Sequence, residues 1–542
     1  MTASTSAPEW PFCGHGADPA GDPVGCRGHA VAPHGQCLQH LAPEARSNYL
    51  AGLAPGSDLN HSGTTFTEDL LNELLTVFRQ PADGPPRIGR AWFVEATFTG
   101  NARFDGATFT GDARFDGATF TGPVVFGAVT FTDDAGFRRA TFTDDAWFMK
   151  ATFTGPTDFN RATFHRNAWF TEATFEATSE LGPLISAEFV QLSGAVFSGP
   201  VTILVAAKRL GCHRTRWTST ATLRLRYATV DLTDAVFEYP LSVATHPQAF
   251  DSHLSVPCDE APLTGLQLQV RLASISGTDA AHLVLSDLDL SGCRFTGTFH
   301  LDQIRLEGDC RFPLAPEGVQ RRGTRLARWT PRQTLAEEHH WRAWRGEPGW
   351  TADPGAGAAA TGPADLARVY RQLRKSLEDG KSEPDAADFY YGEMEMRRLD
   401  RSRPSGERGL LAAYWAVSGY GLRASRALGW LFAAMTATVL AIMLWGLPED
   451  DPKPRSTGVL TDRRITLTTD TPAPVNPGGP LRERLTSERF EKSLRVVVNS
   501  VVFRSSGQNL TTAGTYTEMA SRVAEPVLLG LAVLAVRSRV KR

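Results

Sequence analysis

The amino-acid sequence predicts a mainly β fold, in which short extended segments wind into a solenoid and helices follow near the C-terminus. Two observations predict the solenoid. Phenylalanine recurs from Phe93 to Phe175 at steps that alternate between five and six residues, so the full period is eleven. A small residue stands two positions before nearly every one of these phenylalanines, as in Ala96-Thr97-Phe98. A separation of two places both side chains on the same side of an extended backbone.

An eleven-residue period also occurs in right-handed supercoils of α-helices. This segment, however, is rich in Thr, Gly, Asp and Phe, which are poor helix formers, and its period divides into five and six. Corners such as Thr99-Gly100 favour turns between short strands. We therefore expect phenylalanine side chains to stack inside the solenoid from coil to coil, among them Phe98, Phe104, Phe109, Phe115, Phe120, Phe131, Phe142, Phe153 and Phe164.

These Ala-x-Phe units resemble the pentapeptide-repeat family, whose unit has a small residue, then Asp, Asn or Thr, then a central Leu or Phe. The resemblance implies a right-handed, quadrilateral β-helix in which two eleven-residue periods make one turn, and thus a binding surface. The sixth residue in alternate units departs from the family pattern and should bulge one pair of corners. Residues 181–312, where the rhythm returns at Leu290 and Phe295, should continue the helix with inserted loops, the largest around Pro247–Pro262.

The charge of the chain limits its partners. The 56 basic and 59 acidic side chains leave a formal net charge of −3, which argues against a surface built to bind nucleic acid. Some pentapeptide-repeat proteins mimic DNA through an acidic face and bind topoisomerase. Residues 92–176 contain eleven acidic and seven basic side chains. Because this excess is small, DNA mimicry is the least favoured alternative.

Three of the seven cysteines lie near the N-terminus among histidines. Zinc takes four soft or borderline ligands in a tetrahedron, and short Gly- and Pro-rich loops give these side chains the necessary reach. We expect a structural zinc site with the ligands Cys13, Cys26, Cys37 and His40. His15 or His29 could replace one of them, because the spacing does not match a standard zinc finger. The start of the chain lacks the features of a secretory leader, which predicts a cytoplasmic location and favours metal over disulfides.

Helices are expected on both sides of the solenoid. Glu44–Ala54 and Thr67–Arg79 should form short helices that cap the first coil. After a polar linker rich in Gly, Ala and Pro, Ala364–Lys375 and Ala386–Arg398 resemble a single tetratricopeptide-like hairpin. Within that linker, the run from Glu337 to His340 is interpreted as a polar helix face. The sequence has no phosphate loop, nucleophile elbow or dinucleotide motif, so we do not expect an enzyme.

The C-terminal part predicts a membrane anchor. Leu428–Leu447 carries no charge and is long enough to cross a bilayer of about 30 Å. Arginines such as Arg423 and Arg426 precede it, whereas Glu449, Asp450 and Asp451 follow it, so its N-terminal side should be cytoplasmic. Residues 519–538 should cross back. We expect two crossings of the inner (cytoplasmic) membrane, with both termini and the β-helix in the cytoplasm.

The segment between the crossings resembles a degenerate two-helix potassium-channel pore module. Leu494–Phe503 would be a short amphipathic or re-entrant helix. The filter-like segment and the acid of the final helix are Thr511, Thr512, Ala513, Gly514, Thr515, Tyr516 and Glu525. A potassium filter alternates Gly and Tyr, whereas this segment lacks the second Gly, and Arg495 and Arg504 add positive charge nearby. We therefore favour a pore-like fold retained for anchoring or oligomerisation.

The predicted segments are 1–42 (zinc module), 43–90 (capping helices), 91–180 (regular β-helix), 181–312 (irregular β-helix), 313–363 (linker), 364–402 (helical hairpin), 403–427 (juxtamembrane), 428–447 (first crossing), 448–485 (external loop), 486–518 (pore-like), 519–538 (second crossing) and 539–542 (basic tail). This organisation predicts a membrane-anchored scaffold that presents the β-helix to a protein partner and forms homo-oligomers. The alternative is a gated ion channel with the β-helix as its sensor. The sequence indicates neither the identity of the partner nor any small-molecule ligand.

Overall fold

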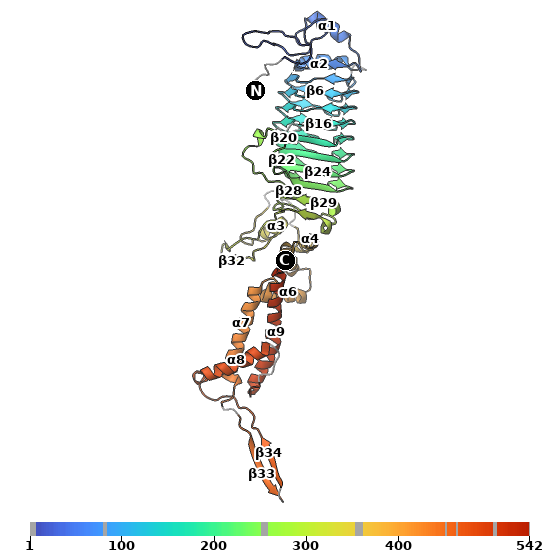
Figure 1. Ribbon diagram of the computed structural model, residues 1–542. Coiled ribbons are helices and arrows are strands. Elements are labelled where there is room, and N and C mark those ends of the chain that lie inside the picture. The colour runs from blue at the N-terminus through green and yellow to red at the C-terminus, as the bar shows by residue number, and fades with distance from the viewer. Residues whose placement is uncertain are drawn as a thin grey trace. The chain divides into compact units, whose positions relative to one another are not determined.

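The structure is a computed structural model that describes residues 7–79, 84–250, 258–352, 361–449, 452–461, 464–501 and 507–540. The chain forms two compact units, Met1–Ser382 and Glu383–Arg542. The first unit contains a stack of short strands, and the second contains helices and one hairpin (Figure 1). Some residues assigned to the membrane region from sequence lie outside the described residues: Asp450, Asp451, Phe503 and Arg504.

The first unit is a four-sided β-solenoid of about 10 turns. Its strands pair in parallel, and each regular coil adds one strand to each of four columns. Thr97 pairs with Thr119, and Val124 pairs with Ala146. Each partner thus lies two eleven-residue periods further along the chain, which is the coil length that the resemblance to pentapeptide repeats implied.

The first column contains β1 (Leu59–Asn60), β4 (Ala91–Trp92), β8 (Ala113–Arg114), β12 (Ala135–Gly136) and β16 (Thr157–Asp158). The second contains β2 (Thr65–Thr67), β5 (Thr97–Thr99), β9 (Thr119–Phe120), β13 (Thr141–Phe142) and β17 (Thr163–Phe164). The third contains β6 (Ala102–Arg103), β10 (Val124–Val125), β14 (Ala146–Trp147) and β18 (Ala168–Trp169). The fourth contains β3 (Arg87–Ile88), β7 (Thr108–Phe109), β11 (Thr130–Phe131), β15 (Thr152–Phe153), β19 (Thr174–Phe175), β21 (Val196–Phe197), β23 (Arg216–Trp217) and β26 (Val236–Phe237).

The phenylalanine side chains form four stacked ladders inside the regular coils. Along one ladder the ring centroids of successive residues are 4.5–5.0 Å apart, from Phe98 through Phe120 and Phe142 to Phe164. The other ladders contain Phe93, Phe115, Phe137 and Phe159; Phe104, Phe126, Phe148 and Phe170; and Phe109, Phe131, Phe153 and Phe175. All of these rings are buried. The phenylalanines expected to stack thus lie on these four ladders.

The two step lengths correspond to two kinds of corner. At a five-residue step the chain makes a tight turn, in which the Ala96 amide donates to the Phe93 carbonyl oxygen and Glu95 adopts a φ of 56°. The same left-handed conformation recurs at Lys150, where φ is 58°. At a six-residue step the corner is a wider bend without this turn, as at Gly100. The extra residue is thus accommodated at alternate corners.

Residues 181–312 continue the solenoid with longer strands. The second and third columns merge at β20 (Glu180–Gln191), whose middle pairs with β17 and whose C-terminal end pairs with β18. The later strands of this merged sheet are β22 (Val201–Gly211), β24 (Ala221–Arg226), β25 (Thr229–Asp231), β27 (Leu241–Thr245), β28 (Arg271–Ser274), β29 (Leu283–Ser286) and β30 (Arg305–Glu307). The described part of the large inserted loop packs Phe250 and Leu263 against Ile185 of the solenoid wall. It is also anchored by an ion pair of 2.7 Å between Arg226 and Glu260.

The solenoid begins earlier than the sequence predicted. Residues 43–90 were assigned to capping helices alone, but β1 and β2 within this range pair with β4 and β5. The helices α1 (Pro43–Ala51) and α2 (Glu68–Val77) do form. Thr67 caps the N-terminus of α2, and the leucines of its buried face lie over the first coil. The sequence did not predict these two strands because they are a single pair, and α2 separates them from the regular repeat.

The segment 313–363 is not only a linker. It contains a hairpin of β31 (Val319–Arg322) and β32 (Arg325–Arg328) and the helix α3 (Ala336–Trp344). The run from Glu337 to His339 is buried rather than a polar helix face. Glu337 accepts hydrogen bonds from the amides of Phe295 and Thr296, at 2.6 and 3.0 Å, and so terminates a late coil.

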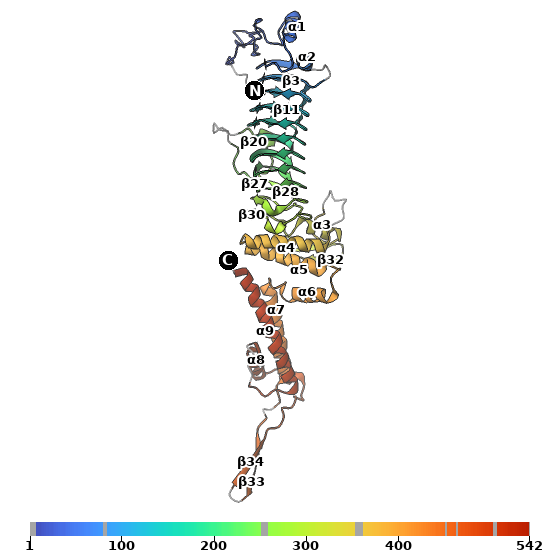
Figure 2. The ribbon, with the colours of Figure 1, turned by 90° about the vertical axis from the view of Figure 1, so that its right-hand side faces the viewer.

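A buried ionic network around Glu338 connects α3 with α4 (Pro363–Asp379) at the C-terminal end of the solenoid. Glu338 accepts hydrogen bonds of 2.6 Å from both Arg332 and Arg342, and Tyr370 of α4 donates to the same carboxylate. Burial raises the pKa of Glu338, but the two guanidinium groups outweigh burial and lower it to about 2. The Ser376 hydroxyl donates to the Ile304 carbonyl oxygen at 2.6 Å, so α4 lies against the end of the solenoid (Figure 2). Short 3₁₀ turns complete this region: Ala261–Leu263, Ala280–His282 and Leu301–Gln303.

The second unit contains the helices α5 (Glu383–Leu399), α6 (Ser405–Ser418), α7 (Ala424–Ala441), α8 (Ser487–Val501) and α9 (Thr512–Val540). A π-helical turn, Ile442–Gly446, extends α7, and a 3₁₀ turn, Leu481–Arg484, precedes α8. The predicted external loop forms a hairpin of β33 (Arg455–Thr461) and β34 (Arg464–Asp470). The predicted helical hairpin divides between the units, because α4 belongs to the first and α5 to the second.

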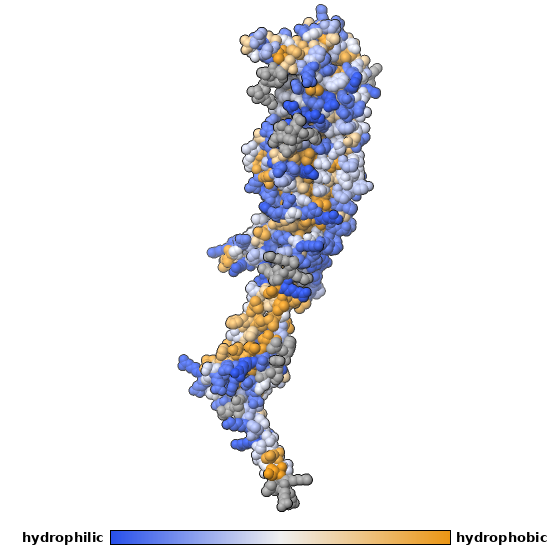
Figure 3. All heavy atoms as spheres, in the orientation of Figure 1, coloured by the Kyte–Doolittle hydropathy of each residue, from blue (hydrophilic) through white to orange (hydrophobic). Residues whose placement is uncertain are grey.

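The helices α7 and α9 pack against each other and are apolar enough to cross a membrane. The candidate spans are Ala424–Gly446 and Thr512–Arg537, both longer than the crossings predicted from the sequence. Each leaves large apolar side chains exposed, including Phe432 on α7 and Val527 on α9. Figure 3 shows hydrophobic side chains gathered over this pair.

The filter-like segment is corrected by the structure. Thr512, Ala513, Gly514, Thr515 and Tyr516 form the first turns of α9 and not an extended loop. The Thr515 amide donates to the Thr511 carbonyl oxygen at 2.9 Å. Carbonyl groups engaged in a helix point along its axis and cannot line a filter. Gly514 instead allows close packing, because a Cβ atom there would lie 2.3 Å from the Gly446 carbonyl oxygen of the π-helical turn.

Candidate metal centre

The N-terminal module brings its ligands together from two paired segments and a turn. The Cys13 amide donates to the Gly28 carbonyl oxygen and the Gly14 amide donates to the Cys26 carbonyl oxygen, both at 2.8 Å, so Cys13 and Cys26 lie on adjacent segments. Cys37 begins a turn in which the His40 amide donates to its carbonyl oxygen at 2.9 Å. The turn places the thiol and the imidazole on the same side.

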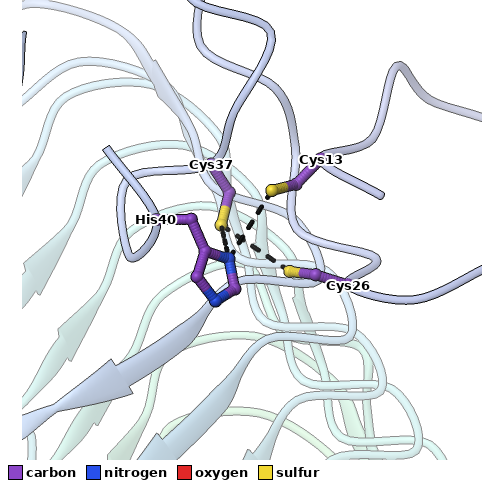
Figure 4. Close-up of side chains that lie close together, drawn as sticks. All are labelled: Cys13, Cys26, Cys37 and His40. Carbon is purple, nitrogen blue, oxygen red and sulfur yellow. Dashed lines mark hydrogen bonds between the residues drawn. The ribbon is translucent and has the colours of Figure 1, made fainter. Parts of the chain in front are cut away.

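Four ligand atoms converge at this point (Figure 4). The Nδ1 atom of His40 lies 3.5 Å from the Cys13 sulfur and 3.4 Å from the Cys37 sulfur, and the sulfurs of Cys26 and Cys37 are 3.7 Å apart. All four atoms lie within 4.8 Å of one another. Ligands about 2.1–2.3 Å from a tetrahedral zinc ion are separated by roughly 3.5–3.8 Å. The described Cys₃His cluster therefore has the dimensions of a metal site.

The two alternative ligands have other positions. The His15 ring stacks on the ring of His40, with their centroids 4.2 Å apart, and so supports a ligand rather than replacing it. His29 is not part of the four-ligand group. Burial lowers the pKa of His29, which favours its neutral form. The predicted primary ligands are thus the ones that come together.

Sequence reasoning missed the residue that makes room for this centre. A Cβ atom on Gly28 would lie 2.7 Å from the Cys37 Cβ and 2.9 Å from its sulfur. The Gly28 amide also donates to the Cys26 sulfur at 3.4 Å, which favours the thiolate form of a ligand. The Gly in Cys26-Arg27-Gly28 was a visible signal, but Gly is common in this segment.

The thiols share their protons unequally. A hydrogen bond from Cys37 lowers the pKa of Cys26 to about 5, and the same contact raises the pKa of Cys37. A thiolate is the form that binds metal. The cluster therefore already favours one thiolate, and a cation would favour the others.

The module rests on the first rung of the solenoid through a buried histidine. His61 is fully buried, its Nε2 atom lies 3.3 Å from the Tyr49 hydroxyl, and its ring packs edge-on against Phe66. The backbone amide of His29 donates to the Ser62 carbonyl oxygen at 2.7 Å. Burial, and then the nearby His29, lower the pKa of His61 to about 3. The metal module and the solenoid are thus packed as one body.

Large aromatic side chains also lie on the outer wall of the solenoid. Trp147 and Trp169 are register partners in neighbouring coils of the third column, and both are half-buried. Phe189 follows in the next coil, with its ring edge-on to Trp169 at 5.8 Å, and the Arg209 guanidinium lies over Phe189. We call these four residues the aromatic stripe. Tryptophan, tyrosine and arginine are enriched among the few residues that dominate the binding energy of protein interfaces.

Charges elsewhere on the wall are paired locally. Arg138 and Asp158 form an ion pair of 2.8 Å, and Arg166 and Asp144 form one of 3.0 Å. Such pairing places both signs of charge side by side on the wall. It agrees with the modest acidic excess that made DNA mimicry the least favoured alternative.

Comparison with known proteins supports the repeat. Residues 93–141 and 137–182 match the family model described as pentapeptide repeats (9 copies). This confirms the predicted family for that segment. No curated protein and no solved structure matches the chain.

Proposed function

We propose that this protein is a membrane-anchored scaffold whose β-solenoid binds a protein partner at the cytoplasmic face of the membrane. The observation that carries the proposal is the presence, in one chain, of a stacked solenoid with an aromatic stripe and a helical unit with exposed apolar spans. Because one chain carries both, insertion of the helical unit into a bilayer would tether the binding surface to the membrane. Pentapeptide-repeat proteins commonly mediate protein interactions, which supports the same function.

Membrane anchoring is tested by flotation of the full-length protein with phospholipid vesicles after an alkaline wash. The protein should float and remain with the lipid, because removal of peripheral proteins does not extract crossing helices. As a matched test, Phe432→Asp and Val527→Asp place a charge on the exposed apolar surfaces of α7 and α9. Recovery of the parent protein in the soluble fraction would contradict the anchor.

The aromatic stripe is the surface that we expect a protein partner to contact. The test is cross-linking in intact cells followed by identification of the proteins linked to the full-length chain. Trp147→Ala and Trp169→Ala together should reduce the cross-linked amount of one specific partner roughly tenfold or more, because truncation of a hot-spot aromatic costs about 2 kcal/mol or more of binding. Trp92→Ala is the control, because Trp92 lies in the first column. Equal loss of the partner in the double variant and in Trp92→Ala would argue against the aromatic stripe as the binding surface.

We further propose that the Cys₃His cluster holds zinc in a structural role. Three thiolates and one imidazole fill a tetrahedron, which leaves no open position for substrate and is typical of structural sites. Elemental analysis of protein purified without chelator should give about one equivalent of zinc per chain. Less than about half an equivalent would contradict this assignment.

Assembly into homo-oligomers through the helical unit also remains a proposal. Mass measurement of the protein in detergent would test it, since a single mass equal to the monomer would exclude stable assembly. A conducting pore has weaker support than the scaffold, because the segment expected to form the filter is helical.

A further inference from the structure

A buried acid lies within the apolar helix α9. Glu525 is 0% exposed and stands near the middle of the candidate span Thr512–Arg537. Its Oε2 atom lies 2.7 Å from the Ser500 hydroxyl oxygen of α8. Within the described part of the chain, its Oε1 atom has no hydrogen-bond partner. A carboxylate in such surroundings is costly unless a cation or a proton neutralises it.

The helix α8 reaches Glu525 by entering the helical unit from the end where α7 finishes. Arg489 donates to the carbonyl oxygens of Met443, Leu447 and Pro448, which fixes the start of α8 beside the end of α7. Further along α8, Val496 and Val497 pack against Val439 and Ile442 of the extended α7. Because of these contacts, the C-terminal end of α8 lies in the interior of the helical unit.

The depth of this site follows from helix geometry. Gly514, near the start of α9, is packed against Gly446 at the end of α7. Glu525 lies eleven residues further along α9, which corresponds to about 16 Å along the helix axis. The pair formed by Ser500 and Glu525 is therefore near the middle of the crossing helices, and no longer beside their ends.

The Ser500 hydroxyl oxygen lies close to two other oxygen atoms, although the hydroxyl has only one hydrogen to donate. Its oxygen lies 2.7 Å from the Val497 carbonyl oxygen and 2.7 Å from the Glu525 Oε2 atom. Both neighbours are acceptors if Glu525 is ionised, and a serine hydroxyl donates only once. Both contacts are hydrogen bonds if Glu525 is protonated, donates to Ser500, and leaves the serine hydrogen for Val497.

The charged groups around this pair have partners of their own. On α9, Arg522 pairs with Glu518 at 2.9 Å. On α8, Arg495 pairs with Glu491 and Lys492 with Glu488, and all four side chains are at least partly exposed. On α7, Arg426 lies in the first turn and donates to the Trp415 carbonyl oxygen. No described ion pair involves Glu525.

We propose that Glu525 and Ser500 form a proton-binding site inside the membrane-spanning unit. The bound proton lies on Glu525, donates to the Ser500 oxygen, and leaves the serine hydrogen on the Val497 carbonyl. Loss of the proton leaves a carboxylate to which the Ser500 hydroxyl can donate only by turning its hydrogen away from the Val497 carbonyl oxygen, so the bound proton determines the direction of the Ser500 hydroxyl. The location within the membrane rests on the proposed anchor, whereas the protonation itself does not.

Infrared spectroscopy of the full-length protein, in phospholipid vesicles and in detergent at neutral pH, tests this site. The C=O stretch of a neutral carboxylic acid is separate from the bands of carboxylates and of the backbone. Glu525→Gln should remove the intensity of one carboxylic acid. Ser500→Ala should keep this intensity but shift the band to higher wavenumber, because the proton loses its acceptor. Glu518→Gln, the control, should leave the band unchanged, because the Glu518 carboxylate forms an ion pair with Arg522.

An unchanged band in Glu525→Gln would overturn the proposal, because Glu525 would then be ionised or paired with a metal cation. A band that Ser500→Ala does not shift would overturn the role of Ser500. Flotation of the same samples separates the two proposals. If the protein does not insert into vesicles, the anchor fails, while the detergent spectra still decide whether Glu525 carries a proton.

Discussion

At the scale of single residues, the imidazole of His40 is the ligand that completes the metal centre. His40→Ala leaves three sulfur ligands and an open position, so zinc affinity should fall by at least a hundredfold and the module should lose its fold. Competition with a chromophoric chelator measures the affinity.

His34→Ala provides the matched control, because His34 is exposed and lies in the same loop without belonging to the four-ligand group. It should bind zinc as the parent protein does. Equal loss in the two variants would show that the fourth ligand had been misassigned.

A second residue-scale prediction concerns His61. Its pKa is lowered from 6.5 in the unfolded chain to about 3 in the folded protein. The unfolded state therefore takes up the proton first, and stability falls as the pH decreases from about 6.5 towards 3. The full loss amounts to several kcal/mol, at about 1.4 kcal/mol for each pKa unit. His61→Phe removes this group and places a ring beside Phe66.

The measurement is denaturant unfolding of the parent protein and His61→Phe at matched pH values between 7.5 and 4. The comparison cancels titrations that both proteins share. Relative to the parent protein, the variant should gain stability as the pH falls. A difference that does not change with pH would mean that His61 is not buried in its neutral form.

At the scale of elements, the wide corners of the solenoid require close backbone contact between coils. A Cβ atom on Gly122 would lie 2.4 Å from the Gly100 carbonyl oxygen of the preceding coil. Gly122→Ala must separate two coils and should destabilise the solenoid by about 1–3 kcal/mol, as overpacking does. Thermal unfolding measures the effect.

Gly127→Ala is the matched control. Its Cβ atom would meet no neighbour closer than 3.4 Å, and its φ lies outside the left-handed region. It should change stability little or raise it slightly, because alanine restricts the unfolded chain more than glycine does. The predicted order would be wrong if Gly127→Ala were the more harmful change.

The buried ionic network around Glu338 gives another prediction at the scale of elements. Glu338→Gln removes the buried carboxylate that Arg332 and Arg342 share and leaves Arg342 with its ion pair to Glu347, which should cost about 3–5 kcal/mol. Because the pKa of Glu338 is lowered from 4.5 to about 2, its contribution is present above pH 4.5 and is lost as the pH falls towards 2. Urea unfolding at pH 7 and pH 3 should show a smaller difference between the proteins at pH 3.

Glu378→Gln removes a carboxylate from an ion pair with Arg374 that is half exposed. Exposed pairs contribute roughly 0–1 kcal/mol, so this change should be almost neutral. Similar losses of stability in Glu338→Gln and Glu378→Gln would show that burial does not strengthen the network around Glu338.

At the scale of the whole molecule, the proposed topology of two crossings with both termini in the cytoplasm would place the hairpin β33–β34 and the segment after it outside. Asn476 is exposed in that segment, and Ser405 is exposed at the start of α6. A membrane-impermeant thiol reagent should label Asn476→Cys in intact cells, but should label Ser405→Cys only after the cells are opened. The reverse pattern would invert the topology.

The repeat is the part of this molecule that the sequence determined by itself. Residues at each position of Ala-x-Phe meet the same environment in every coil, so the period and the ladder can be read from local spacing, whereas the coil length followed from the resemblance to pentapeptide repeats. The ligands Cys13, Cys26, Cys37 and His40 could be predicted for a related reason, because thiols and imidazoles have few other uses when clustered. Both predictions required only residue types and their separations.

The tertiary structure alone decided the places where one side chain meets a distant partner. Glu337 and Glu338 look like a polar helix face, and only the coil at Phe295 and the guanidinium groups of Arg332 and Arg342 explain their burial. Gly514 looks like part of a filter, but its packing against Gly446 makes it a contact between helices. In both cases the meaning of the residue depends on long-range packing, which local spacing does not encode.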